Sequence, residues 1–562
     1  MGQRWIETGL WTHAVPDIAS FIFINCPITS IPLKMKNGYQ YKLFMALVPL
    51  WLALPSKSQA GEVSYSLEDV YKERVGVVSQ SVVALSGLKL QDFLGQVIQK
   101  NNEIQAQRLE WESSEKMVKS SQGIYEPTLK ASLNRNANHV QNTIKETLNQ
   151  GYAAEYSENN TQWNAAVEGL TPFGSTYRVG YDTKQLRNTL QSQLSTSGTG
   201  EYVTFLGLNL SQPLLKGMGQ GVTGAPIRIA RANADIAYEG YRQTVVETVA
   251  RAVQLYWQCY VAQEKLTMRR RSAAIAGEML KLNQSRHDAG KVDYTEVLDA
   301  ESGLRLRQAL VAAAEQTELT TKRNLLSLYN QYTTGLNPVG IEVVDVPDCT
   351  RKDTDYAKSL ESAYKSYPQY QSALTTVERE NVRLAYASNQ LLPQFDLKGS
   401  YGLNGLDKSW GSSLDKAWQK DYLSWSVGLE LSIPLLGDIK SSNESHAARL
   451  RKEQSQKRLE SQKIELANQM EIVSNLVSRV YSQVENYGKV VALNGELSSI
   501  EEMRFRMGKS DIRMMLGRDE DYLKVRESLL DSRLAYQYAL VNLYALEGTL
   551  LDRYGFSFAV KK

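Results

Sequence analysis

The sequence has few of the residues from which catalytic and metal-binding sites are commonly built. Its three cysteines, Cys26, Cys259 and Cys349, lie far apart and show none of the paired spacings typical of zinc sites or redox disulfides. The four histidines are equally scattered, and no nucleophile–base pair or nucleotide-binding loop is evident. We therefore expect no enzyme activity and no metal or other cofactor.

An excess of one charge and long apolar runs are lacking as well. The formal net charge of the 562 residues is +3 at pH 7, which gives no reason to expect a nucleic-acid partner. Beyond residue 60 there is no run of about 18 apolar residues, the length that a membrane-spanning helix needs. A mature transmembrane helix is therefore not expected.

The start of the chain contains a pattern typical of a secretory signal. Lys36 and Lys42 precede a short apolar core, and "SQA" at 58–60 provides the small residues that a signal peptidase requires. We interpret 35–60 as a signal peptide that begins at Met35, residues 1–34 as a non-native upstream extension, and 61–87 as the first segment of the mature chain. The alternative is that the apolar residues 18–33 form a membrane anchor.

The remainder of the chain contains two copies of one pattern. "LNLSQPLLKG" (208–217) recurs as "LELSIPLLGD" (429–438), and "SRHDAGKVDYTEVLDAE" (285–301) recurs as "MRFRMGKSDIRMMLGRD" (503–519). Each copy predicts a helix, two strands, a long helix, a glycine turn and a helix. Copy one has an extra pair of strand-like runs around "EGLTPFGSTYRVGYD". We predict repeats at 88–330 and 355–555, a linker at 331–354 and a tail at 556–562.

The predicted helices are unusually long. No proline occurs between about Pro226 and Arg286 or between about Ser441 and Phe505, and apolar residues recur there in heptads. Some 60 residues span about 90 Å as a helix. The partner helices, at about 90–122 and 294–330, are roughly half as long, so that two laid end to end would match one long helix. This arithmetic predicts a barrel of broken and unbroken helices.

The strands alternate strictly between apolar and polar residues. In "LSWSVGLELSIP" the residues from Leu423 to Ile433 at every second position are apolar, and those between them are mostly serine, glycine or glutamate. Transmembrane β-strands need this alternation over 9–11 residues. A sheet that covers a soluble core predicts the same pattern. The nearby aromatic residues in "SWGSSLDKAWQKDYLSW" indicate either a membrane-interface girdle or a loop.

The glycines of "GMGQGVTG" (217–224) match the G-x-G-x-x-G pattern of dinucleotide-binding proteins. The preceding strand is polar on one face and carries Pro213, and the following helix is far longer than the crossover of such a fold. We therefore interpret this segment as a strand-to-helix junction, in which glycine permits the change of direction. The predicted junction residues are Pro213 and Gly217 in copy one and Pro434 and Gly437 in copy two.

The order and duplication of these motifs resemble the TolC family of outer-membrane efflux proteins. The features that carry the resemblance are the two copies, S-x-P-L-L at the end of a strand, and R-x-x-x-G-K-x-D before "VLDAE". The resemblance implies an α+β membrane protein, a homotrimer whose β-barrel lies in outer-membrane lipid and continues as a periplasmic α-helical barrel. It also implies a passive exit duct of a tripartite efflux or type I secretion system, with a periplasmic adaptor and an inner-membrane pump as partners.

In that family, acidic residues six and nine positions beyond the hairpin glycine help to close the periplasmic entrance. Copy one matches with Glu296 and Asp299, whereas copy two has Met514 and Gly517 there. For copy two we instead predict gate residues among the nearby charges, which are Asp511, Arg513, Arg518 and Asp519. The predicted adaptor-docking residues at the hairpin tips are Gly290, Lys291, Asp293, Gly508 and Lys509.

The competing hypothesis is a periplasmic coiled-coil scaffold or adaptor without a channel. In such a protein the strands would form a small ordinary sheet, and the long helices would bind partners along their length. It predicts that the protein is not resident in a membrane after signal cleavage. The sequence does not indicate which substrate a duct would carry.

Overall fold

The computed structural model describes residues 87–194, 200–329, 340–435 and 437–557. The chain divides into two units, residues 1–80 and 81–562, and everything described here belongs to the second. The predicted upstream extension at 1–34, the signal peptide at 35–60 and nearly all of the segment at 61–87 lie outside the described residues.

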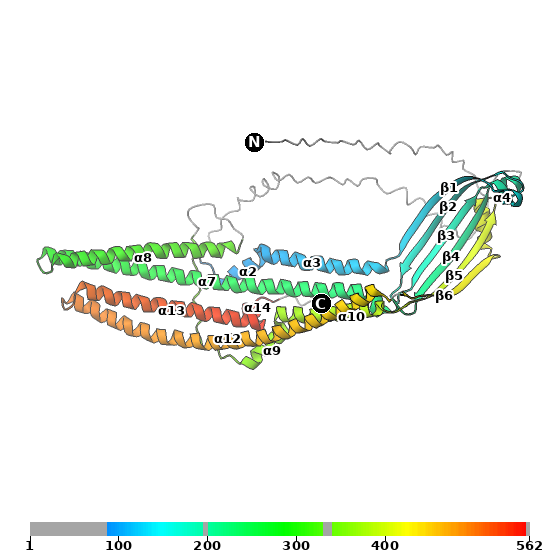
Figure 1. The fold of residues 1–562 in the computed structure, drawn as a ribbon. Helices are drawn as coiled ribbons and strands as arrows, with labels where there is room; N and C mark the ends of the chain where they lie inside the picture. Colours follow the sequence, from blue (N-terminus) through cyan, green and yellow to red (C-terminus); the bar gives the residue numbers. More distant parts are fainter. Residues whose placement is uncertain (1–86, 195–199, 330–339, 436, 558–562) are drawn as a thin grey trace, which may run out of the picture. The chain divides into compact units, whose positions relative to one another are not determined.

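The first repeat has four strands between its helices (Figure 1). The helices that flank the sheet are α2 (Leu90–Lys100), α3 (Asn102–Gln122), α7 (Ala225–Asp288) and α8 (Tyr294–Ser327). The strands are β1 (Thr128–Gln141), β2 (Glu155–Leu170), β3 (Thr176–Leu186) and β4 (Glu201–Pro213). Short helical segments η3 (Gly123–Tyr125), α4 (Ile144–Asn149), α5 (Thr189–Leu194) and α6 (Gln220–Thr223) connect them.

The second repeat has two strands in the same setting. It consists of α9 (Tyr356–Ser366), α10 (Pro368–Gln390), β5 (Gln394–Asp407), α11 (Trp410–Trp418), β6 (Leu423–Ser432), α12 (Ile439–Arg506), α13 (Ile512–Glu547) and α14 (Leu550–Arg553). The strand pair β2–β3 is the extra pair that the sequence predicts for copy one. The loop-or-girdle segment at 409–425 contains a helix, α11, which the sequence does not predict.

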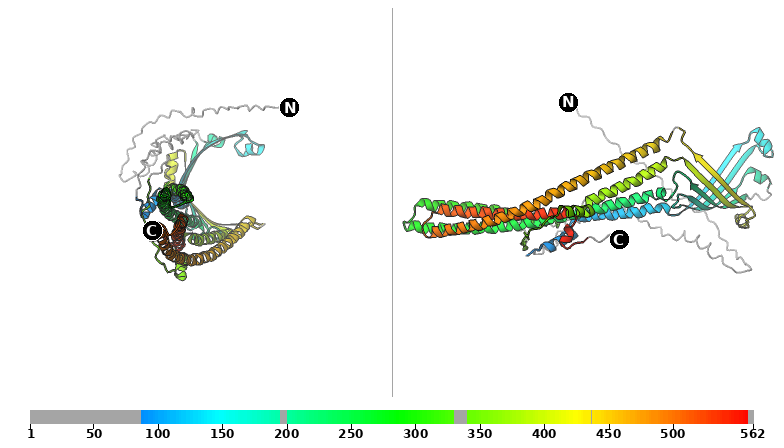
Figure 2. Two further views of the ribbon diagram at one scale, coloured as in Figure 1. Left: turned by 90° about the vertical axis from the view of Figure 1, so that its left-hand side faces the viewer. Right: turned by 90° about the horizontal axis from the view of Figure 1, so that it is seen from below.

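The broken and unbroken helices are present as predicted. The helices α7 and α12 continue without interruption for 64 and 68 residues, which corresponds to about 100 Å each. Both α3 and α8 pack against α7, and both α10 and α13 pack against α12 (Figure 2). Contacts of α7 with α10 and α13 join the two repeats. No helix among the described residues is long and apolar enough to cross a bilayer.

The single helix predicted at about 90–122 is wrong, because the chain breaks at Asn101. Asn101 has extended backbone angles and ends α2. Its side-chain oxygen accepts hydrogen bonds from the backbone N–H groups of Glu103 and Ile104, which makes it the N-cap of α3. Its Nδ2 donates to the carbonyl of Leu328 at 3.1 Å. The break thus lies against the end of α8, the other short helix on α7.

The heptad positions form the core, as predicted. Val249, Tyr256 and Cys259 of α7 are fully buried, and so is Met470 of α12. The Tyr256 hydroxyl donates a hydrogen bond 2.7 Å long to the Leu88 carbonyl and lies 2.8 Å from Asp345 Oδ2. These contacts attach the described part of the predicted linker to the middle of α7. On α12 the buried heptad ends at Val484, and Tyr487, the next position of the heptad, is 38% exposed.

The sheet is a six-stranded antiparallel meander in the order β1-β2-β3-β4-β5-β6. The pair β4–β5 joins the repeats, with Gly207 directly opposite Gly402. The ring of Phe205 occupies the space that a Cβ atom at either glycine would need. The two glycines therefore let an aromatic ring lie flat on the sheet at the seam between the repeats.

Candidate functional site

One face of the sheet is apolar across all six strands. Directly opposite residues of neighbouring strands point to the same face, so the register assigns each side chain to one of two sets. From β1 to β6 the apolar face comprises Leu129, Ala131, Leu133, Trp163, Ala165, Val167, Tyr177, Val179, Tyr181, Leu206, Leu208, Leu210, Leu397, Tyr401, Leu403, Leu423, Trp425, Val427, Leu429 and Leu431. Many of these side chains are exposed: Trp425 is 70% and Val427 67% accessible.

The opposite face is mostly polar and carries ion pairs, although the ring of Phe205 also lies on it, opposite Asp182. Arg178 lies 2.8 Å from Asp182 and 3.4 Å from Glu168, which also pairs with Lys130 at 2.7 Å. At the other edge Lys398 pairs with Glu430. Near the helices this face is hollowed, and the polar lining includes Glu168, Arg178, Asn209, Ser211, Lys398, Ser400 and Ser426. The alternation predicted from the sequence is therefore present on every strand in the part of the sheet next to the helices. At the outer ends of β1 and β2 both faces are polar, because Arg135, His139 and Asn159 lie on the same face as Leu133.

The helix α11 covers the apolar face at the end of the sheet where β4 begins. Its Ser413 is fully buried, and the Ser413 Oγ lies 2.6 Å from the Oγ1 of Thr204. The Nε1 of Trp410 donates to the Tyr181 hydroxyl at 2.7 Å. Gly405 permits the close approach, because a Cβ there would overlap the Ser413 carbonyl. The aromatic residues of this segment thus lie at the rim of the apolar band.

The predicted strand-to-helix junctions are at the opposite end of the sheet. Pro213 is the last residue of β4, and Pro434 follows the end of β6. Gly217 and Gly437 both have positive φ angles, 85° and 73°. Residues other than glycine rarely adopt a positive φ angle, which accounts for the glycine at both points where the chain turns from sheet to helix.

The two hairpin tips have the same local structure. In each, the glycine has a positive φ angle, 68° at Gly290 and 73° at Gly508. The N–H of Lys291 donates to the Arg286 carbonyl at 2.9 Å, and that of Lys509 donates to the Arg504 carbonyl at 2.9 Å. These are the bonds of a Schellman motif, which ends a helix and satisfies its last carbonyls. The predicted docking residues Lys291, Asp293 and Lys509 are all exposed.

An ion pair joins the two hairpins next to the tips. Arg513 Nη2 of α13 donates to Asp299 Oδ2 of α8 at 2.8 Å. This hydrogen bond raises the pKa of the Arg513 guanidinium. Asp511 is the N-cap of α13, because its Oδ1 accepts from the Met514 N–H at 2.7 Å. Glu296 lies in the first turn of α8. The structure therefore brings together Asp299 and Arg513 from the predicted gate set.

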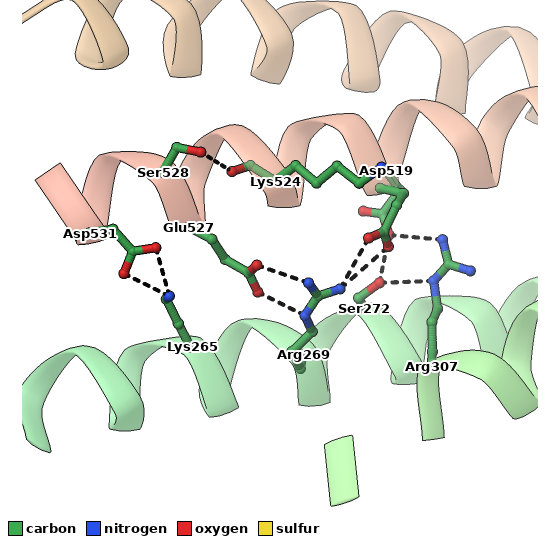
Figure 3. A network of polar contacts seen from close by, with 10 residues as sticks. Lys265, Arg269, Ser272, Arg307, Asp519, Lys524, Glu527, Ser528 and Asp531 are labelled. Atoms are coloured by element: carbon green, nitrogen blue, oxygen red, sulfur yellow. Dashed lines mark hydrogen bonds and ion pairs between the residues drawn. The ribbon is translucent and has the colours of Figure 1, made fainter. Parts of the chain in front are cut away.

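The other two predicted gate residues are placed differently. Arg518 lies 3.9 Å from Asp521 on its own helix and pairs with neither Glu296 nor Asp299. Asp519 is 8% exposed, and its Oδ2 accepts a hydrogen bond of 2.6 Å from Ser272 of α7 (Figure 3). The position of Asp519 close to the hairpin in sequence gives no indication that its side chain is buried between helices.

A polar network along the α7–α13 contact was not predicted from the sequence. Arg307 of α8 is 5% exposed; its Nε donates to Ser272 Oγ at 3.0 Å, and its Nη2 lies 3.7 Å from Asp519 Oδ2. One turn of α7 away, Arg269 pairs with Glu527 at 2.8 Å and with Glu520 at 3.3 Å. Lys265 pairs with Asp531 at 2.7 Å (Figure 3). The network therefore ties α7 and α8 of the first repeat to α13 of the second.

Arg286 supplies a second connection that the sequence does not reveal. Its guanidinium carbon lies 4.7 Å from the centre of the Phe505 ring, and its Nη2 donates to the Phe505 carbonyl at 3.1 Å. Phe505 is 1% exposed and belongs to a small apolar cluster at the tips. The two hairpins are thus held together by a cation–π contact at their ends.

Within the described residues there is no group of three or more His, Cys, Asp or Glu side chains arranged to hold a metal ion. Burial raises the pKa of the Cys259 thiol to about 11. A thiol with so high a pKa is protonated and unreactive near neutral pH.

Comparison with known proteins assigns the family. The model of the outer membrane efflux protein family matches residues 172–331 and 360–549. These two matches together cover more than half of the sequence, and the chain belongs to the outer membrane efflux protein family. The first match begins in the turn between β2 and β3, so that α2, α3, β1 and β2 lie outside it.

Individual relatives are distant. The chain is 24% identical over 267 residues to the alkaline protease secretion protein AprF of Pseudomonas aeruginosa. The aligned region covers 46% of this chain and 53% of AprF. The alignment thus spans about half the length of that relative. Among solved structures, the Campylobacter jejuni CmeC outer membrane channel gives a TM-score of 0.58 at 14% identity, covering 82% of this chain and 86% of CmeC.

Two further channels give similar values. The outer-membrane channel OprN has a TM-score of 0.59 at 15% identity, and the match covers 82% of this chain and 90% of OprN. The open state of the Neisseria gonorrhoeae MtrE outer membrane channel has a TM-score of 0.55 at 16% identity, and the match covers 84% of this chain and 94% of MtrE. At these identities the similarity establishes a common fold.

Proposed function

We propose that the chain is a passive exit duct in the outer membrane, formed by three copies. In this duct the strands of the copies share one barrel in the lipid, and the long helices form a tunnel across the periplasm. The helical tips dock to a periplasmic adaptor and, through it, to an inner-membrane pump. Membership of the outer membrane efflux protein family supports this function.

The observation that carries the proposal is the two-faced sheet. A sheet of a soluble protein buries its apolar face against a core, whereas this sheet exposes Trp425, Val427 and their neighbours on β1 to β6. The opposite face has ion pairs and hydroxyl groups, such as Ser400 and Ser426, whose Oγ atoms lie 2.7 Å apart. Lipid on the apolar side and water on the polar side would satisfy both faces. The scaffold hypothesis provides no partner for the apolar face of the sheet.

The cargo class follows from the partner pump rather than from the duct. AprF is named as a secretion protein for alkaline protease, whereas the family is named for efflux. A passive conduit needs little chemistry specific to its substrate, and both protein secretion and small-molecule efflux are compatible with a polar wall. The proposal therefore covers both classes of tripartite system.

The first experiment measures where the protein resides and how many copies associate. The protein is extracted from a purified outer-membrane fraction in mild detergent, and its mass, corrected for detergent, is determined by light scattering. Three chains in a particle derived from the membrane are expected, with ion conductance after insertion into a planar bilayer. Release by salt as a monomer or dimer would overturn the duct and favour the periplasmic scaffold.

A further inference from the structure

The first repeat contains one hairpin more than the second. In the repeat alignment β1 corresponds to β5, because "GIYEPTLKASL" is echoed by "QLLPQFDLKGS", and β4 corresponds to β6 through the shared S-x-P-L-L motif. The hairpin β2–β3 has no counterpart between β5 and β6, where the chain instead forms α11. Neither the duplication nor the proposed duct requires this hairpin.

The hairpin has the same two faces as the strands on either side of it. Val167 and Val179 lie opposite one another on the apolar face, while Glu168 and Arg178 pair on the polar face. The turn between β2 and β3 is attached to the strand-to-helix junction that follows β4, because the Gly219 N–H donates a hydrogen bond of 3.0 Å to the Phe173 carbonyl. The hairpin therefore continues both the apolar band and the polar wall without a gap.

Both edges of the sheet are left open. Among the described residues, β1 and β6 each pair with a strand on one side alone, and all their residues are exposed. In a bilayer an open edge is very costly, because its N–H and C=O groups have no water to bind. The six strands alternate in direction, so that β6 of one copy would run antiparallel to β1 of the next. Antiparallel closure of such a barrel requires an even number of strands in each chain, because the first and last strands must then run in opposite directions.

We propose that β2–β3 is part of the membrane wall and that three chains close an eighteen-stranded barrel through β1–β6 pairing between copies. The trimer is taken from the proposed function; the inference adds the number of strands and the width of the pore. Barrels of 16–18 strands leave an aqueous channel. The polar face, with Arg178, Asp182, Lys398 and Glu430, would line it.

The width of the helical part supports six strands in each chain. Four helices reach the sheet, in the order α3, α7, α10 and α12 by their mutual contacts (Figure 2). At an interaxial distance of about 8–10 Å, four helices span an arc of about 32–40 Å. Six strands about 4.8 Å apart and tilted by about 35–45° span about 35–41 Å. Four strands would span about 25 Å on the same geometry, which is narrower than the helices below them.

The consequence is a wide exit. Three arcs of this width give a barrel about 36 Å across between backbones. Because barrel and helical tunnel have nearly equal circumference, the wall continues from one to the other without a constriction at the junction. A duct of this width would admit a bulky solute or an unfolded polypeptide at its outer end.

The inference is tested by disulfide cross-linking between copies in the outer membrane. Cys259 and Cys349 are first replaced by alanine. Ser426→Cys on the polar face of β6 is then combined, one at a time, with cysteines at the polar-face positions of β1, which are Lys130, Ser132, Asn134 and Asn136. One position or two neighbouring ones should give covalent dimers and trimers on a denaturing gel. The matched control, Leu133→Cys with Ser426→Cys, should give none, since Leu133 is on the apolar face.

A second measurement places the hairpin. Asn164 and Ala165 are adjacent on β2 and point to opposite faces. In the wall, Asn164→Cys should react with a charged, water-soluble maleimide, whereas Ala165→Cys should react with a lipid-soluble one alone. Equal reaction of both with the water-soluble reagent would remove the hairpin from the wall.

The outcomes separate this inference from the proposed function. A membrane trimer without β1–β6 cross-links at any scanned position, or with a water-accessible Ala165→Cys, would overturn eighteen strands and leave the duct intact. A membrane particle of two or four chains would overturn the eighteen strands, because the total would be twelve or twenty-four, and with them the three-copy assembly of the proposed function. A protein absent from the membrane fraction would overturn both.

Discussion

Arg513 Nη2 and Asp299 Oδ2 lie 2.8 Å apart, although 214 residues separate them in the sequence. Arg513 belongs to the first turn of α13 and Asp299 to the second turn of α8, so that their ion pair connects the equivalent helices of the two repeats next to the tips. The side chain of Arg513 is 80% exposed and that of Asp299 43%. Exposed pairs of this kind contribute little to stability, and the pair is therefore better placed to influence the entrance than the fold.

We expect Arg513→Gln to increase the open probability of the channel in planar bilayers, because the bridge between the hairpins is lost. Asp299→Asn should act in the same direction, and the charge swap Arg513→Asp with Asp299→Arg should restore the closed state. The thermal unfolding midpoint should change little, since the pair is exposed. Arg518→Gln, which removes a charge paired within α13, is the matched control. Equal effects of the two single arginine variants would show that the bridge has no gating role.

Glu296 is expected to influence ion selectivity. It lies in the first turn of α8, three residues before Asp299, and in a trimer three such carboxylates would surround the entrance. Rings of acidic residues favour cations. The variant Glu296→Gln should move the reversal potential in a salt gradient toward zero or toward the anion value. An unchanged reversal potential would remove Glu296 from the gate.

The buried Arg307 should be important for stability. Arg307→Met leaves Asp519 and Ser272 without their cationic partner in the interior. Removing one member of a buried ion pair typically costs about 3–5 kcal/mol. Denaturant unfolding of the detergent-solubilised protein measures this difference. Arg305→Met, two residues earlier on α8 and with a side chain 71% exposed, should be nearly neutral. Addition of Asp519→Leu to Arg307→Met should recover part of the loss, because no uncompensated charge then remains.

Neighbouring positions on β6 should respond differently to a positive charge. Val427→Arg places a guanidinium on the apolar face, at a cost of about 2–4 kcal/mol if that face contacts the bilayer interior. Ser426→Arg places it on the polar face, where water can solvate it. We expect the first variant to reduce the amount of assembled protein in the outer membrane and the second to leave it unchanged. Equal tolerance of both would contradict the assignment of the apolar face to lipid.

Cys259 should resist modification in the folded protein. With its pKa raised to about 11 by burial, about one thiol in a thousand is ionised at pH 8, and its side chain is fully buried. Iodoacetamide followed by peptide mass spectrometry should label it after unfolding in guanidinium but not before. Labelling of the native protein at a rate similar to that of a free thiol would show that α7 opens at this position.

Much of the fold follows from local periodicity. The heptads of α7 and α12 and the alternation along β6 indicate the elements because each pattern is repeated over many residues and depends on one buried face. The break at Asn101 depends instead on a single capping side chain and on the Leu328 carbonyl, more than 200 residues away. Its capping signal, an asparagine two residues before Glu103, is present in the sequence but is weak next to the helical pattern.

The polar contacts between the repeats are harder to predict for a related reason. Asp519 and Arg518 are neighbours in the sequence, yet one is buried against Ser272 and the other lies at the surface. Which of two adjacent charged residues is buried depends on how α7, α8 and α13 are rotated about their axes. Asp519 lies on the buried side of α13 between Leu516 and Leu523, and the spacing of these residues does not indicate that a carboxylate there will meet an arginine from α8.

The network of Lys265, Arg269 and Arg307 with the acids of α13 lies within a single chain. Together with the contact of Arg286 and Phe505, it holds the two hairpins of one copy together as a rigid unit. In an entrance built from three such units, relative movement of the hairpins within a copy would be confined to the exposed region near the tips, where Arg513 and Asp299 form their ion pair.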